Sequence, residues 1–185
     1  RLHITALNYI SMLVEKKINI NELKVGDSLC YWNKGWISFF IRLFTNSKYS
    51  HTSIVVATGL VTEAIEKGYV ANRIVDSVRN AKQVIVKRPK LNFDKEEFHN
   101  EIFRLLNARY EFEGLYYEAV KQIKPYSKWK GDKEAIKDVF CSKANAWLFW
   151  EIFKLKDYEN WYETTPRDIA NDFKNFETFE LILKQ

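Results

Sequence analysis

One segment of the chain, residues 138–153, constrains the fold more than any other. Taken as a helix, it carries apolar side chains on nearly every side instead of along one stripe. Such a helix has no face for water, so other elements of the same domain must cover it. At 185 residues the chain is long enough to bury a substantial core. We therefore predict one domain built around this helix, whose apolar residues are Val139, Phe140, Ala144, Ala146, Trp147, Leu148, Phe149, Trp150, Ile152 and Phe153.

The composition is that of a globular protein. Hydrophobic residues make up 46% and charged residues 29%, while glycine (6) and proline (3) are scarce, which excludes collagen-like and low-complexity chains. No apolar run approaches the ~20 residues that a bilayer-spanning helix needs. The first residues, Arg1-Leu2-His3, show no signal-peptide pattern. We expect a soluble protein, cytoplasmic by default; a targeting signal trimmed from the chain would leave no trace here.

The charge pattern leaves the nature of a partner open. The formal net charge is +5, and lysines gather in residues 128–137. Such a cluster can attract nucleic acid, anionic lipid or a cell-wall polymer. Acids interleave with these lysines, which favours an ordinary solvated face instead. The lysines are Lys128, Lys130, Lys133 and Lys137, and the acids are Asp132, Glu134 and Asp138.

The predicted elements run from strands to helices. Residues 1–20 have apolar positions at helical spacing and predict an N-terminal helix outside the core. Predicted strands follow at 28–32, 49–57, 60–65, 68–74, 83–88 and 179–183. Predicted helices cover 36–44, 94–107, the part of the aromatic-rich stretch 110–123 that follows Gly114, and 138–153, and one more starts at Pro166. This order indicates an α+β domain with an antiparallel sheet of about five or six strands.

Cys141 lies at the start of the buried helix. There the helix dipole and the unpaired N–H groups of the first turn favour a thiolate. The alternative is a buried structural cysteine, the commonest fate of a free cysteine. The other cysteine, Cys30, is on the first predicted strand without a helix terminus beside it, so we predict that it is a bystander.

A base and an acid for such a cysteine are found on two neighbouring predicted strands. His51 lies in the β-branched run 49–57, and Glu63 lies between apolar residues of the return strand. A buried carboxylate needs a partner, and the imidazole of His51 is the best one. Each residue also has an ordinary interpretation, His51 as a satisfied core or surface side chain and Glu63 as a solvent-facing one. Glu66 is a nearby substitute for Glu63.

Other chemistries lack a sequence signature. The chain has no Cys-x-x-Cys, no His-Glu-x-x-His, no phosphate-binding loop, no dinucleotide glycine fingerprint and no Gly-x-Ser-x-Gly. His3 and His99 are poorer bases, since one is near the first residue and the other is on the polar side of a predicted helix. A Cys–His pair is therefore favoured largely by elimination.

Short segments spread over residues 23–183 occur in a specific order. They are the Gly-Asp turn Leu23 to Asp27, a helix and Ser-His strand over 39–56, Thr62-Glu63-Ala64, the aromatic stretch Asn107 to Gly114, Phe140-Cys141-Ser142 and Thr165-Pro166-Arg167-Asp168-Ile169. This order resembles the circularly permuted NlpC/P60 group of papain-like enzymes, the YiiX-like proteins. Ordinary papain-like chains carry the cysteine before the histidine, whereas here His51 comes first.

The resemblance implies a fold and a set of roles. It implies a permuted papain-like domain over residues 23–185, with an antiparallel sheet packed against the nucleophile helix. Residues 1–22 are left as the helical extension that their own spacing predicts. His51 would be the base, Glu63 the orienting acid and Cys141 the nucleophile. Backbone N–H groups at Cys141 would hold the oxyanion, with Tyr31 as a candidate side-chain donor.

This sequence differs from the family pattern at one position. The family usually has glutamate after Cys-Ser, and this chain has Lys143. Lys143 opposes the helix dipole, yet it could favour the thiolate or bind an anionic substrate group. Aromatic residues are expected to line a groove toward Cys141, with Trp36 as a substrate contact beside Trp32 and the stretch 110–117.

The activity implied is that of a cysteine amidase, peptidase or esterase. It would act on cell-wall peptides or lipid-linked acyl groups without a metal or organic cofactor. We expect no nucleic-acid partner, while a membrane surface stays open. Two alternatives share the fold: an acyltransferase of the lecithin:retinol acyltransferase kind, and a binding module in which Cys141 is inert.

Overall fold

The computed structural model describes residues 16–106, 109–110, 138–139 and 141–183. Within these residues a seven-stranded sheet has the order β1-β9-β6-β2-β3-β4-β5, and a second, two-stranded sheet pairs β7 with β8. All neighbours in the large sheet are antiparallel except β1 and β9, which are parallel. The strands are β1 Lys17–Ile18, β2 Ser28–Asn33, β3 His51–Ala57, β4 Leu60–Ile65, β5 Gly68–Arg73, β6 Ala81–Pro89, β7 Arg109–Tyr110, β8 Asp138–Val139 and β9 Phe176–Leu181.

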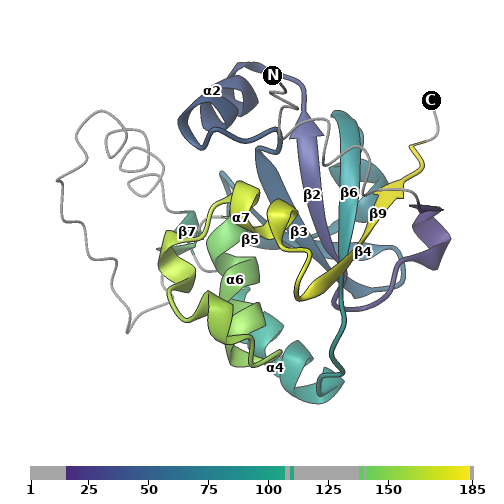
Figure 1. Cartoon of the computed structure of the whole chain (residues 1–185), viewed down its shortest axis with the longest axis vertical. Coiled ribbons are helices and arrows are strands. Elements are labelled where there is room, and N and C mark those ends of the chain that lie inside the picture. The colour runs from purple at the N-terminus through teal and green to yellow at the C-terminus, as the bar shows by residue number, and fades with distance from the viewer. Residues whose placement is uncertain (1–15, 107–108, 111–137, 140, 184–185) are drawn as a thin grey trace, which may run out of the picture.

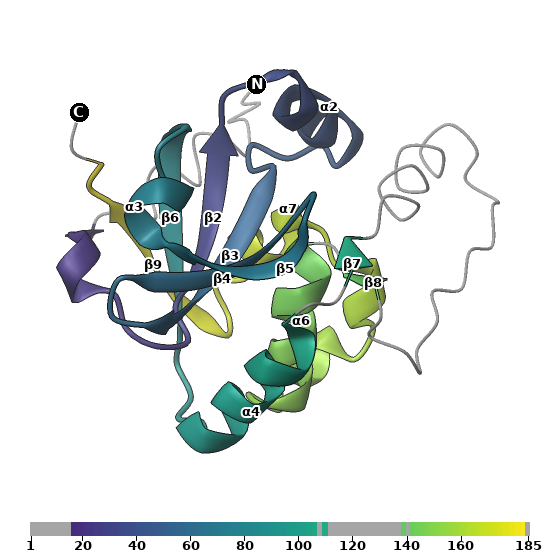
Figure 2. The same ribbon diagram turned by 180° about the vertical axis from the view of Figure 1, so that it is seen from behind.

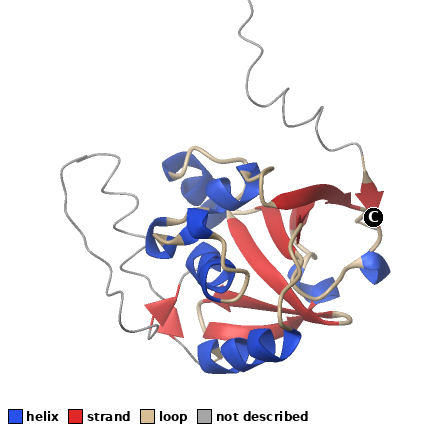
Figure 3. Ribbon diagram, turned by 60° about the horizontal axis from the view of Figure 1, so that its bottom comes forward, coloured by secondary structure: helices blue, strands red, loops and turns tan. Residues whose placement is uncertain are grey.

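The two faces of the large sheet are covered differently. Figure 1 shows α4 (Lys95–Leu105), α6 (Cys141–Glu151) and α7 (Pro166–Asn171) in front of the sheet. Seen from behind in Figure 2, the short helix α3 (Ile74–Ser77) lies over β4 and β6. Coloured by element type, the helices gather mainly on one side of the strands (Figure 3). α2 (Trp36–Phe44) stands apart, at the end of the sheet where β2 finishes.

Strand alternation builds a separate core on each face. On β2 and β3, Cys30, Ile54 and Val56 belong to the cluster that packs against α4 and α6. Leu29 and Val55, one residue out of step with them, belong to the cluster on the opposite face. The mostly apolar α6 fills the first cluster, where Ala144, Ala146, Leu148 and Phe149 are fully buried. The prediction that this helix lies in the core is confirmed.

A tight turn enters the sheet at Gly26 and Asp27. Gly26 has φ +89°, which favours glycine, and a Cβ placed there would lie 2.6 Å from the Phe93 ring. The buried Asp27 carboxylate accepts two hydrogen bonds from the Arg88 guanidinium, at 2.8 and 2.7 Å, and a third from the Lys24 N–H. The Gly-Asp motif thus has a structural role in this fold.

Several predicted elements are confirmed. The structure is α+β, the helix at 36–44 and the strand at 60–65 have the predicted bounds, and Asp94 caps α4 by accepting from the Glu96 and Glu97 N–H groups. α7 begins with Pro166 at its first position, and its Thr165–Asp168 capping box gives the Thr-Pro-x-Asp motif a structural role.

Other predictions were wrong. Lys17 and Ile18, expected in a helix, form β1, because they pair with Glu180 and Leu181 at the sheet edge. Ile74 opens α3 instead of ending a strand. The buried helix begins at Cys141, since Asp138 and Val139 pair with β7. The sheet has seven strands because β1 adds to it. The helix predicted after Gly114 and most of the one at 1–20 lie outside the described residues.

Among the described residues no helix is long and apolar enough to cross a membrane.

Candidate active site

His51 and Glu63 form a short hydrogen bond between two neighbouring strands. His51 Nε2 lies 2.6 Å from Glu63 Oε2. His51 opens β3 and Glu63 lies in the middle of β4, where it pairs with Ser53. Since His51 and Ser53 are two residues apart, they point to the same face of the sheet as Glu63. Pairing of the two strands therefore brings the imidazole and the carboxylate together.

Two further polar side chains form hydrogen bonds with the Glu63 carboxylate. Asn72 on β5 donates to Glu63 Oε1 at 2.8 Å, and Ser77 in α3 donates to Glu63 Oε2 at 3.1 Å. Glu63 is itself buried. Burial alone would raise its pKa, but the hydrogen bond and charge of His51 lower it below the usual carboxyl value. Glu63 is therefore held as a carboxylate of fixed orientation.

Cys141 is the other partner of the imidazole. It opens α6, which packs against β3 and β4. Burial alone would lower the pKa of His51, but the charge of Cys141 and a hydrogen bond with it, together with Glu63, raise that pKa to about 10. Because Nε2 faces Glu63, Nδ1 is the ring nitrogen left for the sulfur. The structure thus joins His51 to Glu63 directly and brings α6, which Cys141 opens, onto the same strands, while the catalytic roles of the three residues stay a prediction.

Tyr31 is fully buried next to His51. It pairs with His51 across β2 and β3, and the two ring centroids are 5.3 Å apart. Its hydroxyl is 2.5 Å from Ser53 Oγ and 3.0 Å from Ser77 Oγ. Burial raises the pKa of Tyr31 above its usual value. In this arrangement Tyr31 supports the His51 ring.

The remaining candidate substrate contacts lie in different surroundings. Lys143 belongs to the first turn of α6 and is buried. Trp36 opens α2 and is exposed, with its ring edge-on to that of Phe40. Of the predicted groove lining, residues 111–117 lie outside the described part of the chain, so the groove stays a prediction.

Cys30 lies in the core near Cys141. It is fully buried, and this burial raises the pKa of its thiol to about 12. Its chemistry is therefore that of a neutral core side chain.

Sequence reasoning missed Asn72, Ser77 and Asn145. The Asn145 amide, one turn after Cys141, donates to Ser28 Oγ at 2.8 Å and to the Ser53 carbonyl at 3.0 Å. These bonds tie the start of α6 to β2 and β3. A buried-helix pattern interrupted by one amide was the only signal for Asn145 in the sequence.

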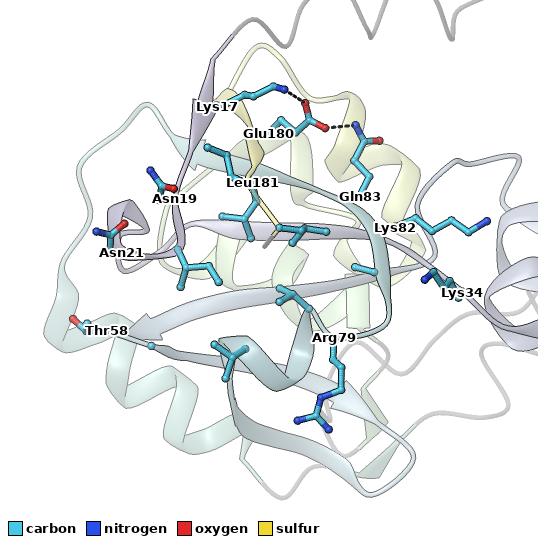
Figure 4. A pocket seen from close by; sticks show the side chains of 17 residues that line it. Lys17, Asn19, Asn21, Lys34, Thr58, Arg79, Lys82, Gln83, Glu180 and Leu181 are labelled. Atoms are coloured by element: carbon cyan, nitrogen blue, oxygen red, sulfur yellow. Dashed lines mark hydrogen bonds and ion pairs between the residues drawn. The ribbon is translucent and has the colours of Figure 1, made fainter. Parts of the chain in front are cut away.

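A hollow of about 1790 Å³ lies on the face of the sheet opposite α6 (Figure 4). Ile20, Val78 and Leu181 are among its apolar walls, and cationic side chains stand around it. Cys141, His51 and Glu63 do not line it. The hollow is therefore separate from the candidate active site.

Comparison with known proteins bears on the fold. No protein-family model and no curated protein matches the sequence. Among solved structures, the crystal structure of the metalloprotein YiiX from Escherichia coli O157:H7 is similar, with a TM-score of 0.57 and 16% sequence identity. The similarity covers 88% of this chain and 97% of that one. This chain has a YiiX-like fold.

YiiX is a metalloprotein. Among the residues that the structure describes, no three histidine, cysteine, aspartate or glutamate side chains are grouped so as to hold an ion. Glu63 Oε2 and His51 Nε2 bind each other instead.

Proposed function

We propose that the protein is a cysteine hydrolase, an amidase, peptidase or esterase that works through an acyl-enzyme. One observation carries the proposal: the His51 imidazole is hydrogen-bonded to the buried Glu63 carboxylate, and the helix that Cys141 opens packs against the strands of both residues. Nucleophile, base and orienting acid in this relation define thiol and serine hydrolases on unrelated folds.

The chemistry follows from the positions of the groups. His51 Nδ1 takes the Cys141 proton, and the sulfur attacks the substrate carbonyl carbon. N–H groups of the first turn of α6, unpaired within the helix, can receive the oxyanion. As the intermediate collapses, the carbon–nitrogen or carbon–oxygen bond breaks and His51 returns the proton to the leaving group. Water, deprotonated by His51, then cleaves the thioester and releases the acid.

Two features support placing the chain with the circularly permuted NlpC/P60 enzymes. The strand with the base precedes the helix with the nucleophile, and the fold is YiiX-like. The expected substrates are cell-wall peptides or lipid-linked acyl groups. Lys143 and Trp36 stay candidate substrate contacts, the first for an anionic group and the second for an apolar one.

The decisive experiment uses activated acyl esters and amides with the full chain. Wild-type protein should form a thioester at Cys141, visible by intact mass, and release the free acid. Cys141→Ala should abolish both, while the matched variant Cys30→Ala should keep both. Added amine or alcohol that captures the acyl group in preference to water would identify an acyltransferase. A wild type that neither acylates nor turns over would identify a binding module.

A further inference from the structure

Helix α2 turns its apolar face outward. Trp36, Phe39, Phe40 and Leu43 are 72, 54, 44 and 58% exposed. At 3.6 residues per turn these four positions fall within an arc of roughly 100°. The width of that arc is typical of an apolar helix stripe that packs against another surface.

The exposed side chains form one continuous cluster. The Phe40 ring lies edge-on to those of Trp36 and Phe39, at centroid distances of 6.2 and 5.6 Å. Single exposed apolar residues are normal on a protein surface, but contiguous ones indicate a binding face. The core side of the same helix is occupied by Ile41, which is buried. One side of α2 therefore packs against the domain, and the apolar side faces solvent.

Three cations surround Trp32 at the foot of this helix. Lys48 Nζ, Lys82 Nζ and the Arg42 guanidinium carbon lie 4.8, 5.3 and 6.0 Å from the ring centroid. Lys34 follows on the loop between β2 and α2. The main acid facing the group is Glu180, which accepts from Gln83 and lies 4.0 Å from Lys17. Three like charges about one ring repel each other, and an anion would relieve that repulsion.

The sequence keeps acids away from this region. No aspartate or glutamate occurs between Asp27 and Glu63, or between Asp76 and Asp94. All four cations lie in these two stretches. Figure 4 shows Lys34 and Lys82 together at one end of the hollow, far from Asn19 and Thr58.

We propose that α2 docks the protein on the surface of an anionic lipid membrane. The aromatic and leucine side chains enter the boundary between headgroups and acyl chains, and Arg42, Lys48 and Lys82 meet the phosphates. An apolar helix face with cations at its flank is the arrangement found in interfacial helices. A symmetric contact between two copies through this face would bring two cationic clusters together, so a lipid surface fits better than a second copy. The inference does not depend on the chemistry of Cys141.

The test is sedimentation of the full chain with lipid vesicles. Wild-type protein should bind vesicles of phosphatidylcholine mixed with phosphatidylglycerol, and bind those of phosphatidylcholine alone far more weakly. Lys48→Gln and Lys82→Gln should each weaken binding about fivefold at low salt. Phe39→Ser combined with Leu43→Ser should weaken it at least about tenfold.

Matched controls separate this face from the rest of the surface. Phe103 on α4 is 72% exposed, as Trp36 is, and Phe103→Ser should bind as wild type does. Lys67→Gln, in the turn between β4 and β5, should weaken vesicle binding far less than Lys48→Gln does. Cys141→Ala should bind fully even if hydrolysis is lost, which separates this inference from the proposed function.

Three outcomes would overturn the proposal. The first is a wild type that ignores anionic vesicles. The second is equal binding by the α2 variant and Phe103→Ser. The third is a wild-type dimer without lipid that the α2 substitutions convert to a monomer, since the face would then join two copies.

Discussion

His51 has two partners, Cys141 and Glu63. Burial alone would lower the pKa of His51, but these partners raise it to about 10. The imidazole is therefore protonated at neutral pH, with the Glu63 carboxylate at its Nε2. A cation beside a thiol favours the reaction of the sulfur as a nucleophile.

Cys141 should therefore react with iodoacetamide at pH 7 at least about tenfold faster than a cysteine in a short peptide. His51→Ala removes the cation and should slow this reaction. Glu63→Gln should slow it by less, because Glu63 acts through His51. The measurement is the alkylation rate at pH 7 by mass spectrometry.

Lys143→Ala is the control for that experiment, since this lysine stands two residues from the sulfur and could favour the thiolate by itself. If wild-type Cys141 reacts no faster than the peptide cysteine and none of the three substitutions changes its rate, the cysteine is structural.

Cys30 should behave as a silent thiol. Its burial and a pKa raised to about 12 leave almost no thiolate at neutral pH. We expect peptide mapping to find Cys141 labelled at least about tenfold faster than Cys30 in the native protein. Cys30→Ser should retain any hydrolysis. Faster labelling of Cys30 would reverse this assignment.

At the residue scale the sequence predicted groups that have distinctive chemistry. Cys141, His51 and Glu63 stood out as a thiol at a helix start, a histidine in a β-branched run and an acid between apolar residues. Asn72 and Ser77 could not be found in this way, because strand register and α3 alone bring them to Glu63. Ordinary polar residues carry no sign of the contact they will make.

At the scale of elements, the turn before β2 should be sensitive to single substitutions. In Gly26→Ala the new methyl group would meet the Phe93 ring at 2.6 Å and the backbone would keep an unfavourable φ. We expect a loss of about 2–4 kcal/mol of unfolding free energy, from strain and repacking together. The measurement is urea denaturation.

Gly59→Ala is a matched control for Gly26→Ala. Gly59 also has a positive φ, +76°, but nothing lies within 4 Å of an added Cβ. The unfolding free energy should fall only by the cost of backbone strain, about 1 kcal/mol. Equal losses at the two glycines would mean that the Phe93 contact contributes nothing.

Asp27→Asn should destabilise the same turn by a different cause. The substitution leaves the guanidinium of the largely buried Arg88 without its carboxylate. Breaking a buried pair in this way costs about 3–5 kcal/mol. Urea denaturation measures this loss, and it should not depend on the salt concentration as strongly as that of an exposed pair. A loss under ~1 kcal/mol would contradict the turn's assigned role.

Elements with local signals were predicted well from the sequence. Pro166 and the Thr165–Asp168 box define the start of α7, and Asp94 defines that of α4. Elements that depend on distant partners were not. Lys17 and Ile18 are extended because β9, at the other end of the sequence, offers a free edge. Helical spacing in a short segment cannot reveal that edge.

At the scale of the whole molecule, Lys87 should make the unfolding free energy depend on pH in the alkaline range. It is fully buried, and burial lowers its pKa to about 8. Its ammonium donates to the Ala170 carbonyl at 3.0 Å and to Thr178 Oγ1 at 2.8 Å, which links β6 to α7 and β9. In the unfolded chain a lysine keeps its proton up to pH ~10.4.

Between about pH 8 and ~10.4 the unfolded chain therefore binds more protons at Lys87 than the folded one does. This residue's contribution to stability should rise with pH across that window. His51 contributes with the opposite sign, since its stabilisation is lost as pH rises through about 10. Comparison with Lys87→Met cancels the His51 contribution.

The measurement is the unfolding free energy of wild type and Lys87→Met from pH 7 to pH 10. The difference between them should shift in favour of the wild type as pH rises. Parallel curves would show that Lys87 keeps its ordinary affinity for protons in the folded protein.

The placement of the base also sets an order of assembly. His51 and Glu63 lie twelve residues apart within the β3–β4 hairpin. Closing so short a loop costs little entropy, so this pair can form as soon as the hairpin does. Cys141 arrives much later in the chain and meets the imidazole only when α6 docks on the sheet. A ribosome-bound or partly folded chain can thus hold the His51–Glu63 pair before Cys141 has joined it, and the candidate active site is complete only in the finished fold.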